Sequence, residues 1–200
     1  MKKIVAATQN TGKLRELRFI MRDWPIEILS LADIGLEDLD VEETGTSFVE
    51  NALIKARAVK QQTEHAVLSD DSGLCVDALN GEPGIYSARF GGDVPFSEKR
   101  QMLLRLMSNE HNRKAHFMCA IALIDTTGHE VTAEGRVDGV VAKAERGEHG
   151  FGYDAIFQIT DGRTFGEIEF EEKHAMSHRY EALCQLREKL EHEENFGIFR

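Results

Sequence analysis

The first twenty residues place a short apolar run before a glycine-containing turn and an amphipathic segment, and this order restricts the fold strongly. Ile4–Ala7 suits a buried strand, and residues 10–12 form a typical turn sequence. Leu14, Leu17 and Ile20 then recur at helical spacing. A strand, turn and helix in this order aims backbone N–H groups and a helix N-terminus at one place, where an anion can bind.

The rest of the chain continues this alternation and adds a late hairpin. Short strands are predicted at 26–29 and 66–68, and a hairpin at 117–124 and 131–137. Helices are predicted after Ser47, from Ser97 and after Ser177. In the helix predicted from Ser97, the residues expected to face the core are Met102, Leu103, Leu106 and Met107. This arrangement predicts an α/β fold with a mixed sheet and flanking helices, in a single domain spanning residues 1–200.

Charge and cysteine content limit the partners of this chain. The formal net charge is −11, which disfavours a nucleic-acid-binding role and means that phosphate chemistry needs a basic pocket or a metal ion. Three cysteines without CxxC spacing favour a reducing compartment, so we expect a cytoplasmic protein. No apolar stretch approaches the length of a membrane span, so no membrane partner is expected.

The turn at the start of the chain is the first candidate site. Its residues are Thr8, Gln9, Asn10, Thr11, Gly12 and Lys13. Short polar side chains, a glycine and a lysine at a helix start suit phosphate, although an ordinary strand-to-helix turn has the same composition. The segment is not a P-loop, because Ala7 stands where that motif needs glycine and Leu14 where it needs serine or threonine.

Acidic residues provide the second candidate site. Asp70 and Asp71 follow the predicted strand at 66–68, and carboxylates at a strand's carboxyl end suit Mg²⁺. An Asx turn is the alternative. Glu42 and Glu43 form another acidic pair before a helix, where complementing the helix dipole is the simpler explanation.

Two further segments contain groups suited to a nucleobase. Residues 150–154 combine glycines, two aromatic residues and a carboxylate, which suits base stacking, although a loop with core aromatics is equally compatible. Lys173, His178 and Arg179 could form a cationic cluster near the last helix, or a solvated helix face.

Taken together, these segments resemble the inosine/xanthosine triphosphate pyrophosphatase family. The matching text, in the family's order, is ATQNTGKLREL, EETGTSFVENA, SDDSGLCVDAL, PGIYSARF, GFGYD and EEKHAMSHR. Two departures are Ala155, where proline is usual, and the last nine or so residues, which extend past the familiar end. The resemblance implies two lobes around a central active-site cleft, a homodimer, and at least one Mg²⁺ per subunit.

The resemblance also implies an activity and residue roles. The activity is hydrolysis of ITP, dITP and XTP to the monophosphate and pyrophosphate, which keeps these nucleotides out of DNA and RNA. Asp71 would be the general base and a Mg²⁺ ligand, with Glu42 its preferred acidic partner and Glu43 the alternative. Thr8–Lys13 would bind the triphosphate and Ser72 would contact substrate. The residues that would hold the nucleotide, chiefly its base, are Phe151, Gly152, Tyr153, Asp154, Lys173, His178 and Arg179.

Two other functions remain open. A Maf-like nucleotide pyrophosphatase would use a similar fold on other nucleotides. A nucleotide-binding module would bind the same ligand without releasing pyrophosphate. The activity towards a panel of nucleotides distinguishes all three.

Overall fold

The computed structural model describes residues 2–192; Met1 and residues 193–200, which hold the C-terminal extension, lie outside the described residues. The strands are β1 Lys2–Ala6, β2 Ile26–Leu29, β3 Ala66–Val76, β4 Lys114–Ile124, β5 Glu130–Val141 and β6 Phe157–Gln158. The α-helices are α1 Thr11–Ile20, α2 Phe48–Lys60, α3 Phe96–Leu106, α4 Phe170–Lys173 and α5 His178–His192. Short 3₁₀ helices lie at Ala32–Ile34, Asp77–Leu79, Gly84–Tyr86, Asp154–Ile156 and Phe165–Glu167.

The strands form a mixed sheet, as the sequence predicts. Over the described residues the strand order is β2-β1-β3-β4-β5-β6. β1 pairs in parallel with both β2 and β3, whereas β5 and β6 pair antiparallel. β4 and β5 are neighbours joined by a short turn, which confirms the predicted hairpin, although both strands are longer than expected.

The prediction that a strand ends just before Asp70 is wrong, because β3 runs on to Val76. The pairing of β1 with β3 nevertheless stops at Leu68, where β1 itself ends. The two carboxylates therefore lie inside a strand, immediately past the carboxyl end of its parallel neighbour. Gly73 allows the strand to continue, since a Cβ there would come within 2.3 Å of the Gly84 carbonyl oxygen.

The chain divides into two compact units. Of the described residues, the first unit comprises 2–71, 119–135 and 179–192, and the second comprises 72–118 and 136–178. The chain passes from one unit to the other after Asp71 within β3, after Met118 within β4, after Gly135 within β5 and after His178. Each unit has its own apolar core.

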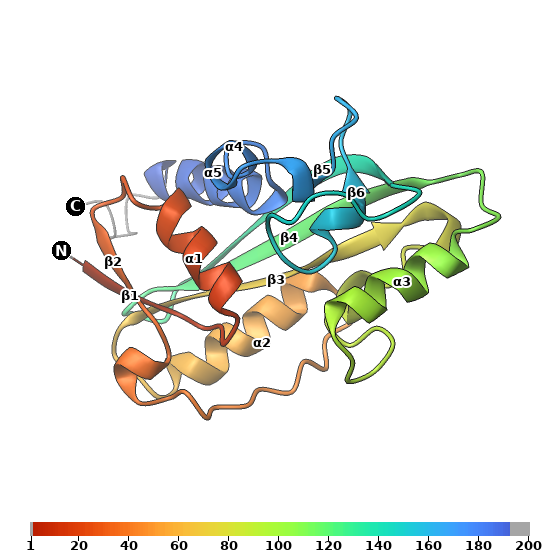
Figure 1. Ribbon diagram of the computed structural model, residues 1–200. Coiled ribbons are helices and arrows are strands. Elements are labelled where there is room, and N and C mark those ends of the chain that lie inside the picture. The colour runs from red at the N-terminus through yellow and green to blue at the C-terminus, as the bar shows by residue number, and fades with distance from the viewer. Residues whose placement is uncertain (1, 193–200) are drawn as a thin grey trace. The chain divides into compact units, whose positions relative to one another are not determined.

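The first unit has helices on both faces of its part of the sheet (Figure 1). On one face, Leu17 of α1 and Leu186 of α5 join a core cluster with Ile4 and Leu68. On the other face, α2 packs Ala52 and its neighbours against alternate residues of the same strands, such as Val5. Successive side chains of a strand point to opposite faces of the sheet, so adjacent residues of β1 pack against different helices.

The second unit builds its core from α3, the remaining halves of the long strands and several aromatic side chains. Leu103 and Met107 are fully buried there, together with Phe157 and Phe165. The expectation that Leu106 packs inward is wrong, because its side chain is 56% exposed at the end of α3. Leu106 is the last residue of α3, at the edge of the stripe that Leu103 and Met107 define, and its side chain faces solvent.

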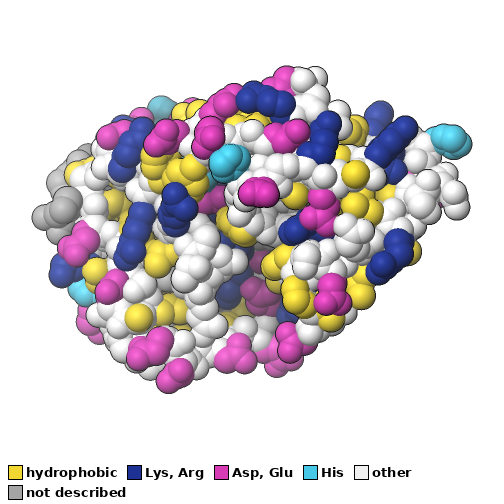
Figure 2. All heavy atoms as spheres, viewed as in Figure 1, with side chains coloured by type: hydrophobic (Ala, Val, Ile, Leu, Met, Phe, Trp, Pro, Cys, Tyr) yellow, Lys and Arg dark blue, Asp and Glu magenta, His cyan; other side chains and the backbone are white. Residues whose placement is uncertain are grey.

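None of the helices within residues 2–192 combines the length and apolar character that crossing a membrane requires. On the face drawn in Figure 2, acidic and basic side chains are interspersed.

Candidate active site

The N-terminal loop places Lys13 at the start of α1. Asn10 caps this helix, because its side-chain oxygen accepts a hydrogen bond from the Lys13 N–H at 3.1 Å. Thr8 in turn accepts from the Asn10 N–H, and the Gln9 amide donates to the carbonyl oxygens of residues 37 and 39. The side chains of this loop thus shape the backbone, and within residues 2–192 the first-turn N–H groups of Thr11 and Gly12 have no acceptor and are available for an anion.

Asp70 is a buried carboxylate held between two cations. Lys13 Nζ lies 3.2 Å from Asp70 Oδ2, and the Arg179 guanidinium donates to the same oxygen at 2.8 Å. Burial raises the pKa of Asp70, but the positive charges of Lys13 and Arg179 outweigh it, so the pKa lies well below its usual range. Arg179, itself buried, also pairs with Glu16 of α1. Asp70 therefore remains ionised at every physiological pH.

Asp71 is in a different environment, although it is the next residue. Its Oδ2 accepts a hydrogen bond from the Asn51 amide, and its Oδ1 lies 3.2 Å from Lys55 Nζ. Burial raises the pKa of Asp71; Lys55 and Lys13 oppose this rise without cancelling it. A carboxylate with a raised pKa is a stronger base than an exposed aspartate.

Of the two glutamates before α2, the structure brings Glu43 to Asp71. Lys55 Nζ lies 2.6 Å from Glu43 Oε1 and so bridges the two carboxylates. Glu42 is exposed, and no contact links it to this cluster within the described residues. Glu43, the alternative at the level of sequence, thus becomes the better partner for Asp71.

The donor set at Asp71 fits a magnesium ion that is completed by substrate. Within residues 2–192, no group of three or more Asp, Glu, His or Cys side chains forms a metal cage of its own. Magnesium commonly uses only one or two carboxylates, with phosphate and water filling the remaining positions. Asp71 and Glu43 already share one cation, the Lys55 ammonium, and the buried Asp70 Oδ1 has no hydrogen-bond partner in this part of the chain.

Sequence reasoning did not identify Lys55, Asn51 or Glu16. Asn51 and Lys55 are four residues apart on α2, so they lie side by side, next to the apolar stripe of that helix. Two polar residues beside a buried stripe could have marked them as candidates. Glu16 has no such local signal, since its partner Arg179 is 163 residues away.

In the second unit, the loop at residues 150–154 closes around one carboxylate. Asp154 Oδ2 accepts a hydrogen bond from the Phe151 N–H at 2.8 Å and pairs with Lys173 Nζ at 2.6 Å. Gly150 has a positive φ of 76°, and a Cβ there would come within 2.1 Å of the same oxygen. The Lys173 ammonium also lies 5.3 Å from the centre of the Phe151 ring. The structure thus joins Phe151, Asp154 and Lys173 in one cluster.

Tyr153 and His178 pack into the second unit's aromatic core. Tyr153 is 3% exposed and its hydroxyl donates to the Ser87 carbonyl oxygen at 3.0 Å. The His178 ring stacks on Phe117, with 4.7 Å between the ring centres. Phe151 is more exposed than either, so it is the aromatic residue of this loop best suited to stack on a ligand.

Arg179 and Ser72 are the remaining residues that the sequence predicts to contact substrate. Arg179 contacts Glu16 and Asp70 in the first unit, so its guanidinium holds the carboxylate cluster. Ser72 is the first residue of the second unit and is partly buried.

Comparison with known proteins decides the family. The model of the Ham1 family matches residues 4–189, nearly the whole described chain. The chain belongs to the Ham1 family. It is 41% identical over 189 residues to a dITP/XTP pyrophosphatase of Thermoanaerobacter sp. (strain X514), covering 92% of this chain and 94% of that protein. It is 42% identical over 196 residues to the dITP/XTP pyrophosphatase of Bacillus subtilis (strain 168), covering 96% and 98%.

Solved Ham1 structures share the fold. A HAM1 protein from Coxiella burnetii is 39% identical, with a TM-score of 0.86, covering 96% of this chain and 100% of that one. The Staphylococcus aureus Ham1 protein is 38% identical, with a TM-score of 0.84 and coverages of 95% and 98%. These matches confirm the mixed α/β fold and the family resemblance predicted from the sequence motifs.

Proposed function

We propose that this chain hydrolyses non-standard purine nucleoside triphosphates, namely dITP, XTP and ITP, to the monophosphate and pyrophosphate. The observation that carries the proposal is the Asp71 carboxylate, which burial makes more basic, set beside Lys55 in a Ham1 chain. The relatives named above as dITP/XTP pyrophosphatases support the choice of substrate. Removing such nucleotides would keep deaminated bases out of DNA and RNA.

In this proposal, the N-terminal loop and the carboxylate cluster bind the triphosphate and cleave it. Lys13 and the N-terminal N–H groups of α1 bind phosphate oxygens, and Thr8, Gln9 and Asn10 hold that turn in shape. Asp71 orients the attacking water and accepts its proton, while Lys55 fixes the carboxylate. Arg179 keeps Asp70 ionised and in place rather than contacting the base.

Magnesium is the proposed cofactor, held by Asp71 and Glu43 together with oxygens of the substrate. When bound, it would neutralise the negative charge that develops on the departing pyrophosphate. Lys13 supplies positive charge for the same purpose, which matters in a chain of net charge −11.

The loop at residues 150–154 binds the base in this proposal. Phe151 stacks on the purine, Asp154 and Lys173 fix the loop that carries it, and His178 supplies a donor. Donors suit the 6-keto oxygen of hypoxanthine or xanthine, whereas the 6-amino group of adenine would leave them unpaired. Gly152 and Tyr153 complete the loop, and Ser72 contacts substrate.

The cellular setting and assembly belong to the same proposal. The three cysteines are free, two of them buried, and we propose a cytoplasmic location, since a reducing compartment keeps thiols free. We expect a homodimer that acts on free nucleotides and engages neither nucleic acid nor membrane.

The test is pyrophosphate release from dITP, XTP, GTP, ATP and dTTP at equal concentration, with Mg²⁺ and then with EDTA. We expect strong, Mg²⁺-dependent release from dITP and XTP and little from the others. Pyrophosphate release mainly from dTTP, the pyrimidine nucleotide of the panel, would support a Maf-like enzyme instead. Binding without release across the panel would indicate a nucleotide-binding module.

A variant of Asp71 tests the mechanism. Asp71→Asn keeps the shape of the side chain but removes the base, so we expect kcat to fall by about 10²–10⁴-fold with the fold intact by circular dichroism. Asp161→Asn, at an exposed aspartate paired with Arg163, serves as the control and should leave kcat unchanged. Near-normal turnover in Asp71→Asn would remove Asp71 from the mechanism.

A further inference from the structure

Arg100 of α3 reaches the loop at residues 150–154 and holds one of its peptide groups. Its Nη1 donates a hydrogen bond of 2.8 Å to the Gly152 carbonyl oxygen, and its Nε donates one of 2.8 Å to Glu145 Oε2. The other oxygen of Glu145 accepts from the Gln101 amide at 2.7 Å. Both side chains are mostly buried, with 18% of Arg100 and 27% of Glu145 exposed. The hydrogen bond to Glu145 therefore fixes the orientation of the guanidinium plane with which Arg100 binds the loop.

The bond to Gly152 fixes the direction of the peptide that follows. A trans peptide is planar, with its N–H pointing opposite to its C=O. Since Arg100 binds the Gly152 carbonyl, the Tyr153 N–H points away from Arg100. Within residues 2–192, neither this N–H nor that of Gly152 has a hydrogen-bond acceptor. Two neighbouring backbone donors are thus available in the loop proposed to hold the base.

Other contacts hold the remainder of this loop without Arg100. Asp154 binds the Phe151 N–H and Lys173, and the Tyr153 hydroxyl reaches Ser87. The Phe96 ring meets the Tyr153 ring edge to face, with 5.5 Å between centres. Loss of Arg100 would therefore free the Gly152 peptide to rotate while the aromatic anchors stay in place.

We infer that Arg100, oriented by Glu145, is a positioning residue for base selection: it turns the Gly152–Tyr153 peptide so that its N–H faces the 6-keto oxygen of the purine. This inference rests on the proposed base-binding role of residues 150–154. Arg100 itself contacts no substrate. Arginine suits this task because its planar fork binds the carboxylate and the carbonyl at the same time.

The experiment compares Arg100→Met with wild-type protein on dITP and dATP. We expect the KM for dITP to rise about tenfold with kcat within about threefold, because base contacts are lost while Asp71 and Lys55 are untouched. The ratio of kcat/KM for dITP to that for dATP should fall at least about fivefold. Inhibition by inorganic tripolyphosphate, which has no base, should be unchanged. Glu145→Gln keeps one oxygen that can bind Arg100. Its KM for dITP and its dITP-to-dATP ratio of kcat/KM should therefore lie between those of wild-type protein and Arg100→Met.

Arg113 provides a matched control. Its guanidinium also binds backbone carbonyl oxygens of the second unit, those of Met107, Val141 and Ala142, each at 2.7 Å. Arg113→Met should lower Tm without changing the dITP-to-dATP ratio. An unchanged ratio in Arg100→Met, or an equal fall in Arg113→Met, would overturn the inference. Failure of wild-type protein to hydrolyse dITP would instead overturn the proposed function.

Discussion

Asp70 retains its charge although its side chain is completely buried, because the cations Lys13 and Arg179 face it directly. Such a cluster carries a large desolvation cost, and its stability depends on every member being present. Removing one partner leaves the others as buried charges without compensation. Replacing Asp70 with a neutral residue of similar shape should therefore destabilise the fold.

Asp70→Asn should lower the free energy of unfolding by about 3–5 kcal/mol, since Arg179 would stay buried with half of its counter-charge. Urea denaturation followed by circular dichroism measures this change. Glu191→Gln is the control, because Glu191 and Arg187 form an exposed ion pair on α5 that should contribute no more than about 0.5 kcal/mol. Equal effects of the two substitutions would contradict the account of the buried cluster.

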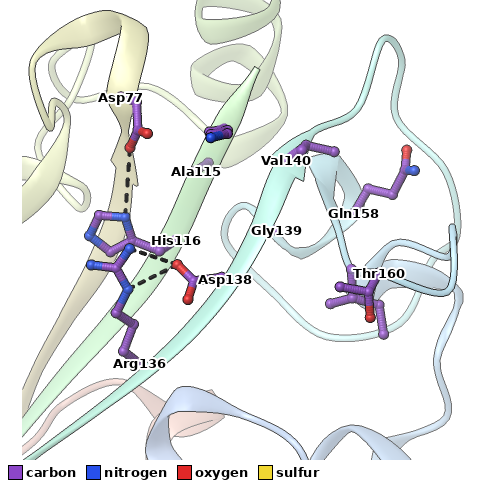
Figure 3. A pocket seen from close by; sticks show the side chains of 11 residues that line it. Asp77, Ala115, His116, Arg136, Asp138, Gly139, Val140, Gln158 and Thr160 are labelled. Carbon is purple, nitrogen blue, oxygen red and sulfur yellow. Dashed lines mark hydrogen bonds and ion pairs between the residues drawn. The ribbon is translucent and has the colours of Figure 1, made fainter. Parts of the chain in front are cut away.

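Among the strands, β4 and β5 carry a second set of titratable groups, which the proposed reaction does not use. A cavity of about 490 Å³ lies here, lined by His116, Arg136 and Asp138 together with residues such as Gln158. Figure 3 shows Asp77 directed towards His116, and Arg136 paired with Asp138. Burial lowers the pKa of His116 and Arg136 lowers it further, while Asp138 and Asp77 partly oppose them.

This arrangement predicts how His116 titrates. By NMR, its pKa should lie below the ordinary value of 6.5, should rise in Arg136→Gln and should fall further in Asp138→Asn. Because the unfolded chain binds this proton more readily, His116 should reduce stability as the pH falls below about 6.5. A His116 pKa that does not respond to either substitution would show that these strand neighbours do not control it.

At the scale of the whole molecule, each unit encloses one fully or nearly buried cysteine. Cys119 lies in the first unit and Cys75 in the second. Burial raises the pKa of Cys75 to about 11 and that of Cys119 to about 12. Both thiols are thus protonated at neutral pH, and only the thiolate reacts with labelling reagents.

Thiol labelling should therefore report the opening of each unit separately. In Cys184→Ser, which removes the more exposed thiol, labelling of native protein at pH 8 should be far slower than in urea and should accelerate as the pH rises. Mass spectrometry of peptides distinguishes Cys75 from Cys119. Labelling of both at the unfolded rate under native conditions would contradict the burial described for the two cores.

The local elements could be predicted because their signals are local. Apolar residues three and four apart mark α1, α2 and α5, and the turn residues 126–128 mark the hairpin. The motif text likewise identified the family that the comparisons confirm. The end of β3 was mispredicted because polar residues such as Asp70 usually end a strand, whereas here tertiary ion pairs stabilise them inside it.

Patterns within short stretches of chain were enough to predict the order of elements, the mixed sheet and the family, because each of these signals is local. The three-dimensional structure was needed to find the partners of the carboxylates, which are Lys55 and Glu43 for Asp71 and Arg179 for Asp70. It also revealed the contact between Arg100 and Gly152, 52 residues apart. An ion pair depends on distance and burial in space, and separation along the chain does not encode either of them.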